Sequence, residues 1–307
     1  MNVTLRSDGA PGRVLVTGHR GFTGHYVTAA LHAAGYDVLG LSTQPADLTA
    51  PGVDLLDRAA VRRAVDDARP DAVVHLAAIA FVAHGDAEEM YRTNVVGTRN
   101  LLEALAAQAQ APRAVLLASS ANVYGNSDVE LLDERVVASP ANDYAVSKLA
   151  MEYMAKLWTD RLPITLARPF NYTGVGQAEN FLLPKIVSHF QRRADVIELG
   201  NIDVARDFQD VRFVADAYTR LLAADAAGAT VNLCSGTSVS LMEVIGMMQD
   251  IAGYEIEVRV NPAFIRGNEV ARLTGDNRLL RSLIGPLDII PLRATLEWMY
   301  ENHTLAR

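Results

Sequence analysis

Short apolar runs alternate with segments of helical periodicity over the first 170 residues. We expect strands at 13–17, 36–42, 72–77, 114–118 and 164–168, and helices at 24–34, 59–68, 88–110 and 144–162. The strand runs are apolar almost throughout, which indicates burial on both faces of a sheet. The pattern therefore predicts an α/β fold, in which a doubly wound parallel sheet carries helices on both faces.

The regular alternation ends after Pro169. Short helices and loops are expected there, followed by a late strand at 230–234 and a helix from near Ser240. We predict that residues 1–170, with a returning segment at about 204–235, form the sheet domain. Residues 171–203 and 236–307 are expected to form a smaller α/β domain beside it.

Composition removes several classes of protein. The chain has 307 residues and a formal net charge of −8, which argues against a general nucleic-acid binder because such proteins carry a basic patch or stripe. The single cysteine, Cys234, excludes a disulfide framework and a cysteine-rich zinc site, and we expect no metal. The longest nearly apolar run, 72–83, is shorter than the roughly 20 residues that span a bilayer. With no apolar signal region at the amino terminus, we expect a cytoplasmic protein.

A glycine-rich loop follows the first strand. Gly18, Gly21 and Gly24 are spaced G-x-x-G-x-x-G between a strand and a helix. In that position the backbone can approach a pyrophosphate closely, and the N–H groups at the start of the helix face it. The loop predicts a dinucleotide site formed by Gly18, Arg20, Gly21, Phe22, Thr23 and Gly24.

The second strand bears on which dinucleotide binds. It ends in Leu41-Ser42-Thr43-Gln44, without the acid that grips the ribose 2′-hydroxyl in NAD-preferring sites. Arg20 in the loop can meet a 2′-phosphate with its planar guanidinium. We therefore expect NADP(H), with NAD(H) left open, and place Ser42 at the cofactor. Asp54 and Leu55 are expected to end a third strand and border the adenine.

Tyr144 and Lys148 stand four residues apart, on one face of a predicted helix. A tyrosine with a pKa near 10 is a poor proton donor at neutral pH, and a neighbouring lysine cation lowers that pKa. Ser120 follows the strand at 114–118, where parallel-sheet enzymes place active residues. We predict a catalytic set of Ser120, Tyr144 and Lys148, in which the serine hydroxyl holds a carbonyl oxygen.

The glycine loop, the serine at a strand end and the Tyr-x-x-x-Lys pair, in this order, resemble the extended short-chain dehydrogenase/reductase family over nearly the whole chain. The resemblance implies an NADP-binding Rossmann-type domain followed by a smaller sugar-nucleotide-binding domain. It also implies that Leu76, Ala77 and Ala78 line the cofactor and that Asn94 is a family position on the following helix. Pro169 would pass the nicotinamide amide, and Asn171 would touch a substrate phosphate.

Four clusters in the second half, at 180–185, 200–203, 206–208 and 266–270, are similar to GDP-sugar members of this family. By that resemblance Asn180 and Lys185 approach the diphosphate and guanine, and Arg206 and Arg266 clamp phosphate. Glu269 would accept hydrogen bonds from ribose hydroxyls. Ser120 and Asn122 are expected to contact the substrate.

Departures from other members narrow the reaction. The 4,6-dehydratases carry Thr-Asp-Glu where this chain has Ser-Ala-Asn at 120–122, so dehydration lacks an acid/base pair. Members of the GDP-fucose synthase type use a cysteine directly after the serine for epimerisation. Ala121 occupies that place, and Cys234 lies on a strand expected to be buried. Simple hydride transfer is the chemistry that remains.

The chain most resembles the family's reductases of GDP-4-keto-6-deoxy-D-mannose. We expect NADPH-dependent reduction of the C4 keto group, giving GDP-D-rhamnose or GDP-6-deoxy-D-talose. Two alternatives stay open, an NAD-dependent GDP-sugar 4-epimerase and a catalytically idle nucleotide-sensing protein. The resemblance further implies a homodimer through a four-helix interface built from the helices at 88–110 and 144–162. The sequence leaves open whether Met151 and Met154 lie in that interface or in the core.

Overall fold

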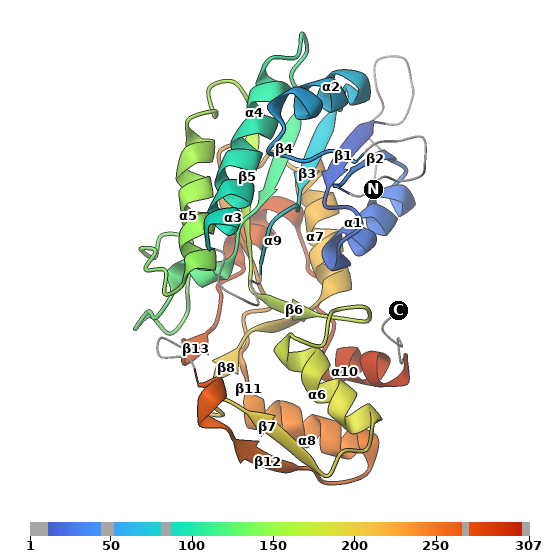
Figure 1. Ribbon diagram of the computed structural model, residues 1–307, viewed down its shortest axis with the longest axis vertical. Helices are drawn as coiled ribbons and strands as arrows, with labels where there is room; N and C mark the ends of the chain where they lie inside the picture. Colours follow the sequence, from blue (N-terminus) through green and yellow to red (C-terminus); the bar gives the residue numbers. More distant parts are fainter. Residues whose placement is uncertain (1–11, 44–51, 81–86, 266–269, 303–307) are drawn as a thin grey trace.

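The computed structural model describes residues 12–43, 52–80, 87–265 and 270–302. Its main feature is a six-stranded sheet in the order β10-β5-β4-β3-β1-β2, in which every neighbouring pair is parallel (Figure 1). The strands are β1 Arg13–Thr17, β2 Asp37–Leu41, β3 Ala72–His75, β4 Ala114–Ala118, β5 Ile164–Pro169 and β10 Thr230–Leu233. The doubly wound parallel sheet that the sequence predicts is therefore confirmed.

Helices cover both faces of this sheet because alternate side chains of each strand point to opposite faces. Val14 and Val16 of β1 face a cluster with α1 Phe22–Ala33, α7 Val211–Ala223 and α9 Arg278–Ile284. Leu15 lies between them in sequence and faces the other cluster. That second cluster includes residues of α2 Arg58–Ala68, α4 Thr98–Ala106 and α5 Asp143–Lys156. Both faces of the sheet are thus buried under helices (Figure 1).

The long helix expected at 88–110 consists of three consecutive segments. They are α3 Ala87–Tyr91, the π-helix η1 Arg92–Gly97 and α4. A Cβ at Gly97 would lie 2.9 Å from the Leu55 Cβ, so this glycine lets the π-helical turn pack closely on the segment before α2. π-Helical turns occur often at functional sites, and this one carries Asn94.

Two sequence predictions of element bounds are wrong. Asp54 and Leu55 belong to no strand, because the Asp54 carboxylate accepts from the Leu56 N–H and Asp57 caps α2 through the Ala59 and Ala60 N–H groups. Such side-chain caps favour turns and helix starts over strands.

The helix expected to reach residue 162 ends at Lys156. The Leu157 and Trp158 N–H groups bond three residues back, which tightens the chain into turns before Pro163. The sequence left open whether Met151 and Met154 lie in the core or in an interface. In the structure, Met151 is buried in the core of the sheet lobe, and Met154 packs against the same cluster.

The second lobe lies below the sheet in Figure 1. Its helices are α6 Leu182–Gln191, α8 Leu241–Ala252 and α10 Leu292–Glu301, packed around one apolar cluster. Its strands are β7 Val196–Leu199 paired with β12 Glu257–Val260, and β8 Ala205–Arg206 between β11 Val239–Ser240 and β13 Arg272–Leu273. The helix expected near Ser240 begins there, with a capping box between Ser240 and Glu243. Two short one-turn helices are also present: η2 Ala121–Tyr124 follows β4, and η3 Pro262–Phe264 follows β12.

The chain crosses between the lobes several times. β6 Asn171–Thr173 pairs with β9 Phe208–Asp210, directly before α7. The returning segment expected at 204–235 contains α7 and β10, which belong to the sheet lobe. α9, which the sequence places in the second domain, also packs there, with Leu280 in the cluster of α1 and α7.

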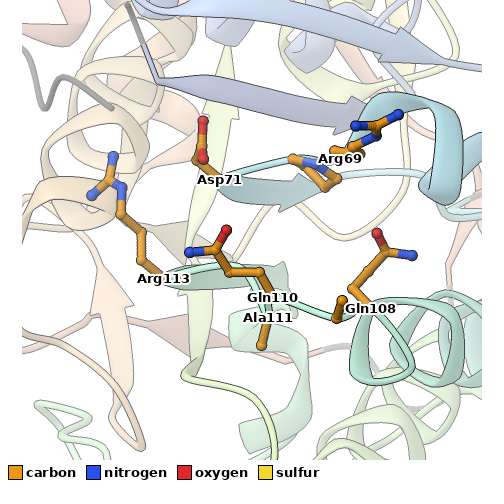
Figure 2. A pocket seen from close by; sticks show the side chains of 8 residues that line it. Arg69, Asp71, Gln108, Gln110, Ala111 and Arg113 are labelled. Carbon is orange, nitrogen blue, oxygen red and sulfur yellow. The ribbon is translucent and has the colours of Figure 1, made fainter. Parts of the chain in front are cut away.

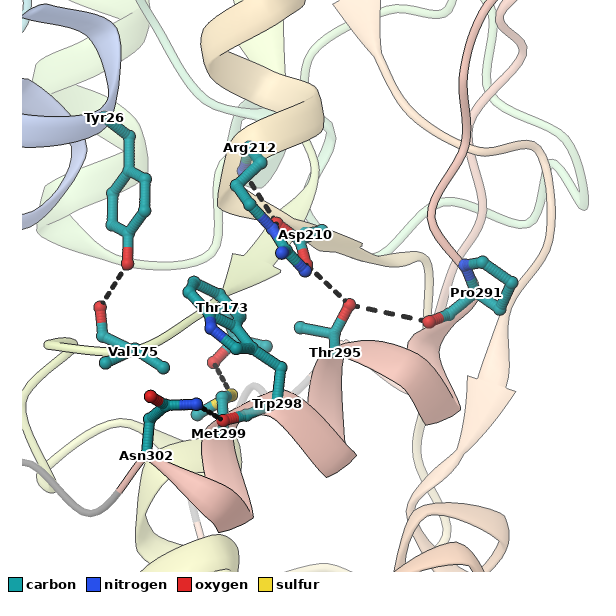
Figure 3. Close-up of polar contacts among 10 residues, drawn as sticks. All are labelled: Tyr26, Thr173, Val175, Asp210, Arg212, Pro291, Thr295, Trp298, Met299 and Asn302. Carbon is teal, nitrogen blue, oxygen red and sulfur yellow. Dashed lines mark hydrogen bonds and ion pairs between the residues drawn. The ribbon is translucent and has the colours of Figure 1, made fainter. Parts of the chain in front are cut away.

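The last helix is fixed to the sheet lobe by a group of polar and aromatic contacts (Figure 3). Asp210 caps α7 and also accepts from the Thr295 hydroxyl of α10 at 2.8 Å. The Arg212 guanidinium lies 3.9 Å from the centre of the Trp298 ring. The Trp298 ring also contacts the Tyr26 ring of α1, with 6.1 Å between their centroids. α10 therefore joins α1 and α7 to the second lobe. Among the described residues, no helix is long and apolar enough to cross a membrane.

Candidate active site

The glycine loop connects β1 to α1 at the carboxyl edge of the sheet. Gly18 has a φ of +69°, and a Cβ on it would lie 2.9 Å from the Ala77 N. A Cβ on Gly24 would overlap the Gly18 carbonyl oxygen. The loop therefore folds only with glycine at both places, and it leaves a bare backbone cradle in front of the twelve-residue helix α1. Such a cradle fits the pyrophosphate of a dinucleotide.

Gly21, the remaining glycine of the loop, leaves more room for a side chain. A Cβ at Gly21 would meet only the Gly18 carbonyl oxygen, at 3.2 Å. Gly21 N donates to that oxygen at 2.9 Å, which closes the turn. The predicted neighbours Leu76, Ala77 and Ala78 directly follow β3, the strand beside β1. The sheet order reverses between β1 and β3, and ligands of open α/β sheets bind at such a point.

A buried row of hydrogen bonds lies beneath this edge. The Thr98 hydroxyl donates to the Asn94 carbonyl at 2.7 Å, so it accepts from His75 Nε2 at 2.8 Å. His75 Nδ1 then accepts from the Thr17 hydroxyl at 2.7 Å. This assigns a neutral imidazole protonated on Nε2. Burial, aided by the charge of Lys148, lowers the pKa of His75 to about 3.

Asn94 extends the row to α5. Its amide oxygen accepts from the Ile79 N–H at 2.8 Å, and its amide nitrogen donates to Ile79 O and to the Ser147 hydroxyl, both at 3.0 Å. Asn94 thereby fixes the chain after β3 against the helix of Tyr144 and Lys148. Sequence reasoning gave Asn94 a place at the cofactor but missed Thr17, His75 and Thr98, because only the sheet register brings them together.

The three predicted catalytic residues meet where β4 ends and α5 begins. Asn142 caps α5 by accepting from the Ala145 N–H, which places Tyr144 in the first turn. Ser120 caps η2 and accepts from the Asn122 N–H at 3.2 Å, and its side chain also hydrogen-bonds Tyr144. The Lys148 ammonium lies 5.9 Å from the centre of the Tyr144 ring and donates to the Ala118 carbonyl at 2.7 Å. A phenol, a hydroxyl and an amine thus face one region.

The electrostatics differ in one respect from the sequence expectation. Burial is the largest effect on Tyr144 and raises its pKa, with Tyr172 adding to the rise and the Ser120 hydrogen bond opposing it. The expected lowering by Lys148 does not decide the outcome, because its ammonium is turned to the Ala118 carbonyl. Burial lowers the pKa of Lys148 to about 8, opposed by the negative charge of Glu152. Tyr144 is therefore a protonated phenol at neutral pH, and Lys148 is mostly cationic.

Tyr172 is a neighbour of the site that sequence reasoning missed. Its hydroxyl lies 2.8 Å from the Thr23 hydroxyl, and its ring stacks on Phe22 with centroids 6.2 Å apart. Tyr172 therefore bridges the glycine loop and the region of Tyr144. In the sequence, Tyr172 stands between Asn171 and Gly174. A single tyrosine on a short strand carries no distinctive pattern, so the sequence did not point to it.

The other predicted cofactor residues border the same edge. Leu55 is buried in the core beneath α4, and Pro169 is buried at the end of β5. The Ser42 carbonyl accepts from the Val53 N–H at 2.8 Å. Arg20 is exposed in the loop. Their contacts with a cofactor stay predictions.

The residues expected to bind substrate divide between the two lobes. Asn122 lies in η2, two residues after Ser120, and the exposed Asn171 begins β6, two residues after the end of β5. Asn180 is exposed before α6. Lys185 donates to the Glu198 carbonyl and lies 4.6 Å above the Phe264 ring, and Arg206 donates to the Ala205 and Ala271 carbonyls. Arg266 and Glu269 lie outside the described residues.

A separate cavity of about 410 Å³ opens at the opposite edge of the sheet (Figure 2). Asp71 and Arg113 line it just before β3 and β4 begin, whereas the glycine loop and Ser120 follow strand ends. The cavity therefore contributes nothing to the candidate active site. Within the described ranges, no cluster of His, Cys, Asp and Glu side chains is suited to a metal ion.

The fold and site define a dinucleotide-binding α/β enzyme with a tyrosine and a lysine at its centre. The family model described as "NAD dependent epimerase/dehydratase family" matches residues 14–234. The chain belongs to this family. The expected family resemblance and the expectation of an NAD(P)-dependent oxidoreductase are thereby confirmed.

Two curated relatives match nearly the full length of the chain. GDP-6-deoxy-D-talose 4-dehydrogenase from Aggregatibacter actinomycetemcomitans is 34% identical over 295 residues, covering 95% of this chain and 98% of its own. GDP-6-deoxy-D-mannose reductase from Pseudomonas aeruginosa is 36% identical over 296 residues, covering 92% of this chain and 94% of its own.

Solved structures agree with the fold over the same length. A putative epimerase from Burkholderia cenocepacia J2315 is 54% identical, with a TM-score of 0.88 and coverage of 95% of this chain and 98% of its own. RMD from Pseudomonas aeruginosa, solved with NADPH, is 33% identical, with a TM-score of 0.84 and coverage of 94% and 98%. The bound NADPH of that protein is consistent with the cofactor expected from the glycine loop.

Proposed function

We propose that this protein reduces the C4 keto group of GDP-4-keto-6-deoxy-D-mannose with NADPH, giving GDP-D-rhamnose or GDP-6-deoxy-D-talose. The observation that carries the proposal is the meeting of Ser120, Tyr144 and Lys148 at the end of β4. The substrate class follows from the two curated relatives, both of which are named for redox chemistry on GDP-6-deoxyhexoses.

Tyr144 is suited to deliver the proton of this reaction. When bound, NADPH supplies the hydride that the C4 carbon receives. As negative charge grows on the C4 oxygen, Ser120 donates a hydrogen bond to it and Tyr144 transfers its phenolic proton. The raised pKa of Tyr144 keeps that proton in place until then. The cationic Lys148 favours the phenolate that remains.

The remaining predicted contacts complete the proposal. Gly18, Gly21, Phe22, Thr23 and Gly24 would hold the pyrophosphate, and Arg20 would meet the 2′-phosphate. The substrate would be held by Ser120 and Asn122 near the sugar and by Asn171 at a phosphate. The residues expected at the rest of the nucleotide are Asn180, Lys185, Arg206, Arg266 and Glu269. No carboxylate is needed among Ser120, Ala121 and Asn122, because reduction at C4 requires a single proton donor.

The test is consumption of NADPH with GDP-4-keto-6-deoxy-D-mannose, generated in place by a separate dehydratase. We expect oxidation of NADPH that requires both the sugar nucleotide and the intact Tyr144, and NMR of the product decides between the rhamno and talo configurations. Binding of NADPH without oxidation would keep the cofactor assignment and reject the GDP-hexose substrate.

A second candidate is a GDP-sugar 4-epimerase that retains NAD. The 54% identity to the putative epimerase from Burkholderia cenocepacia favours it. Denaturing freshly purified protein and assaying the released nucleotide separates the two functions. Stoichiometric NAD supports the epimerase, and a cofactor-free protein that oxidises NADPH supports the reductase.

We also propose that the chain forms a homodimer through α5 and the neighbouring α3–η1 segment. Tyr153 of α5 and Leu157, directly after its end, are 63% and 81% exposed, and Val96 of η1 is 45% exposed. Exposed apolar side chains on adjacent helices are typical of an interface. Sedimentation velocity should show a dimer that Tyr153→Arg with Leu157→Arg converts to a monomer. A wild-type monomer at micromolar concentration would reject the interface.

A further inference from the structure

A buried ion pair lies directly behind the candidate catalytic residues. Glu152, 1% exposed, stands one helical turn after Lys148 on α5. Arg168 of β5 donates to its carboxylate through Nε at 2.8 Å and Nη2 at 2.6 Å. The Ser119 hydroxyl donates to the same carboxylate at 2.5 Å. The mechanism proposed above uses none of these three side chains.

The pair joins the elements that carry the catalytic set. Ser119 immediately precedes Ser120 at the end of β4, and Arg168 immediately precedes Pro169 at the end of β5. Arg168 Nη1 also donates to the Tyr124 hydroxyl at 3.0 Å, which in turn donates to Asn232 of β10 at 2.7 Å. One carboxylate on α5 is thus hydrogen-bonded to two adjacent strand ends of the central sheet.

The charge of Glu152 also acts on Lys148. A buried ammonium tends to lose its proton unless a negative charge lies near. Several groups act on or contact Lys148. Tyr144 and Glu152 lie on its own helix α5, and the neutral His75 of β3 and the Ala118 carbonyl of β4 lie on the sheet. Arg168 of β5 and the Tyr124 phenol of η2 lie behind them, because Arg168 donates to both Glu152 and Tyr124. Asn94 and Thr98 of the adjoining helix are neutral. Glu152 is the carboxylate in this set, and it favours the charged form of Lys148.

We propose that Glu152 is a positioning residue: its charge keeps Lys148 protonated at neutral pH, and its hydrogen bond holds the strand end that carries Ser120. The inference rests on the proposed function, because it explains how the proposed catalytic lysine stays a cation. Arg168 serves to hold the Glu152 carboxylate in place through its two hydrogen bonds, since burying an unpaired carboxylate at that depth is costly.

The chain allows a direct measurement on Lys148. It contains three lysines, Lys148, Lys156 and Lys185, so ¹³C labelling of the lysine ε-carbons gives three signals. The Lys148 signal is the one that disappears in Lys148→Arg. Its titration is expected near the pKa of about 8 that burial sets. This readout needs neither substrate nor cofactor.

Glu152→Gln tests the charge at nearly constant shape. We expect the Lys148 midpoint to fall by about one unit or more, because the carboxylate is lost and the Arg168 cation remains. Ser119→Ala is the matched control, because it removes a hydrogen bond and keeps the charge, and its midpoint should stay within a few tenths of the wild-type value. A Glu152→Gln midpoint equal to or above that of the wild type overturns the proposal.

Glu152→Gln leaves Arg168 buried without a counter-ion and can fail to fold. The double variant Glu152→Gln with Arg168→Met then decides the matter. Its Lys148 midpoint should lie below the wild-type value, because Glu152 is the charged group that raises the pKa of Lys148. A double variant that titrates like the wild type overturns the proposal.

Turnover supplies the second readout. The alkaline limb of the pH profile of kcat should move to lower pH in Glu152→Gln, so that its rate loss is small at pH 6 and about fivefold or more at pH 8. A uniform loss at every pH would mean a merely structural role and would overturn the assignment. If the wild-type protein oxidises no NADPH, the proposed function fails, while the lysine titration still tests Glu152.

Discussion

The hydroxyl groups of Thr23 and Tyr172 lie 2.8 Å apart and join the glycine loop to β6. The Tyr172 ring also stacks on Phe22, the residue before Thr23. The loop that we expect to hold the cofactor is therefore oriented by a residue of β6, where the chain first leaves for the second lobe. The position of the loop depends on that contact.

Tyr172→Phe keeps the ring stacking and removes the hydrogen bond. We expect a loss of about 1 kcal/mol in the free energy of unfolding and a several-fold weaker binding of NADPH, measured by fluorescence titration. Tyr26→Phe is the matched control, because it removes a hydroxyl that donates to the Val175 carbonyl at 2.7 Å outside the loop. Equal NADPH affinity in the two variants would contradict the role of the Thr23 contact.

Tyr144→Phe removes the proposed proton donor and keeps the ring. General acid catalysis contributes roughly 10²- to 10⁴-fold to a rate, and we expect kcat to fall by that factor while the dissociation constant of NADPH changes little. Steady-state kinetics and cofactor titration check both parts. A variant with near-normal turnover would remove Tyr144 from the mechanism.

Gly18→Ala places a Cβ 2.9 Å from the Ala77 N at a φ of +69°. Gly228→Ala is the natural control, because Gly228 has a φ of +81° and nothing within 4 Å of the added atom. The left-handed conformation alone costs roughly 1–2 kcal/mol in both. We expect a clearly larger loss of unfolding free energy for Gly18→Ala, together with loss of NADPH binding. Equal denaturation midpoints for the two variants would show that the loop tolerates the methyl group.

His75 makes stability depend on pH. Its pKa falls to about 3 in the folded protein, against about 6.5 in the unfolded chain. The unfolded state therefore binds one more proton between these values, and the free energy of unfolding falls as the pH drops below about 6.5. The contribution is about 1.4 kcal/mol for each pH unit down to the folded pKa.

The measurement compares slopes rather than absolute stabilities. Urea unfolding between pH 6.5 and 4.5 should show a slope against pH that is smaller in His75→Gln than in the wild type, by about 1.4 kcal/mol per unit. Identical slopes would mean that the His75 ring takes up its second proton inside the fold, which would contradict the neutral imidazole assigned from its hydrogen bonds.

The central sheet could be predicted because its strands are short, nearly continuous apolar runs, which is the pattern of strands buried on both faces. Arg13–Thr17 and Ala114–Ala118 have the same bounds in the structure as in the prediction. Where polar side chains decide the local structure, prediction failed. Asp54 forms a turn with its own backbone, and no apolar pattern reports that competition.

The catalytic set was predictable for a similar reason. Tyr144 and Lys148 are separated by one helical turn, so local spacing is enough to place them on one face. The groups that hold them in place come from distant parts of the chain. Glu152 and Arg168 are separated by 16 residues, and Thr17 and His75 by 58, and their pairing exists only once the parallel register is known.

The position of β10 at the sheet edge has a consequence for how the chain is made. β5 is buried along its whole length, and its outer neighbour is supplied by Thr230–Leu233, far later in the sequence. A nascent chain that has emerged only as far as β5 therefore presents an apolar, unpaired edge, which is prone to aggregate. Protein made only to residue 170 should accumulate in inclusion bodies, because it lacks the strand that covers the outer edge of β5.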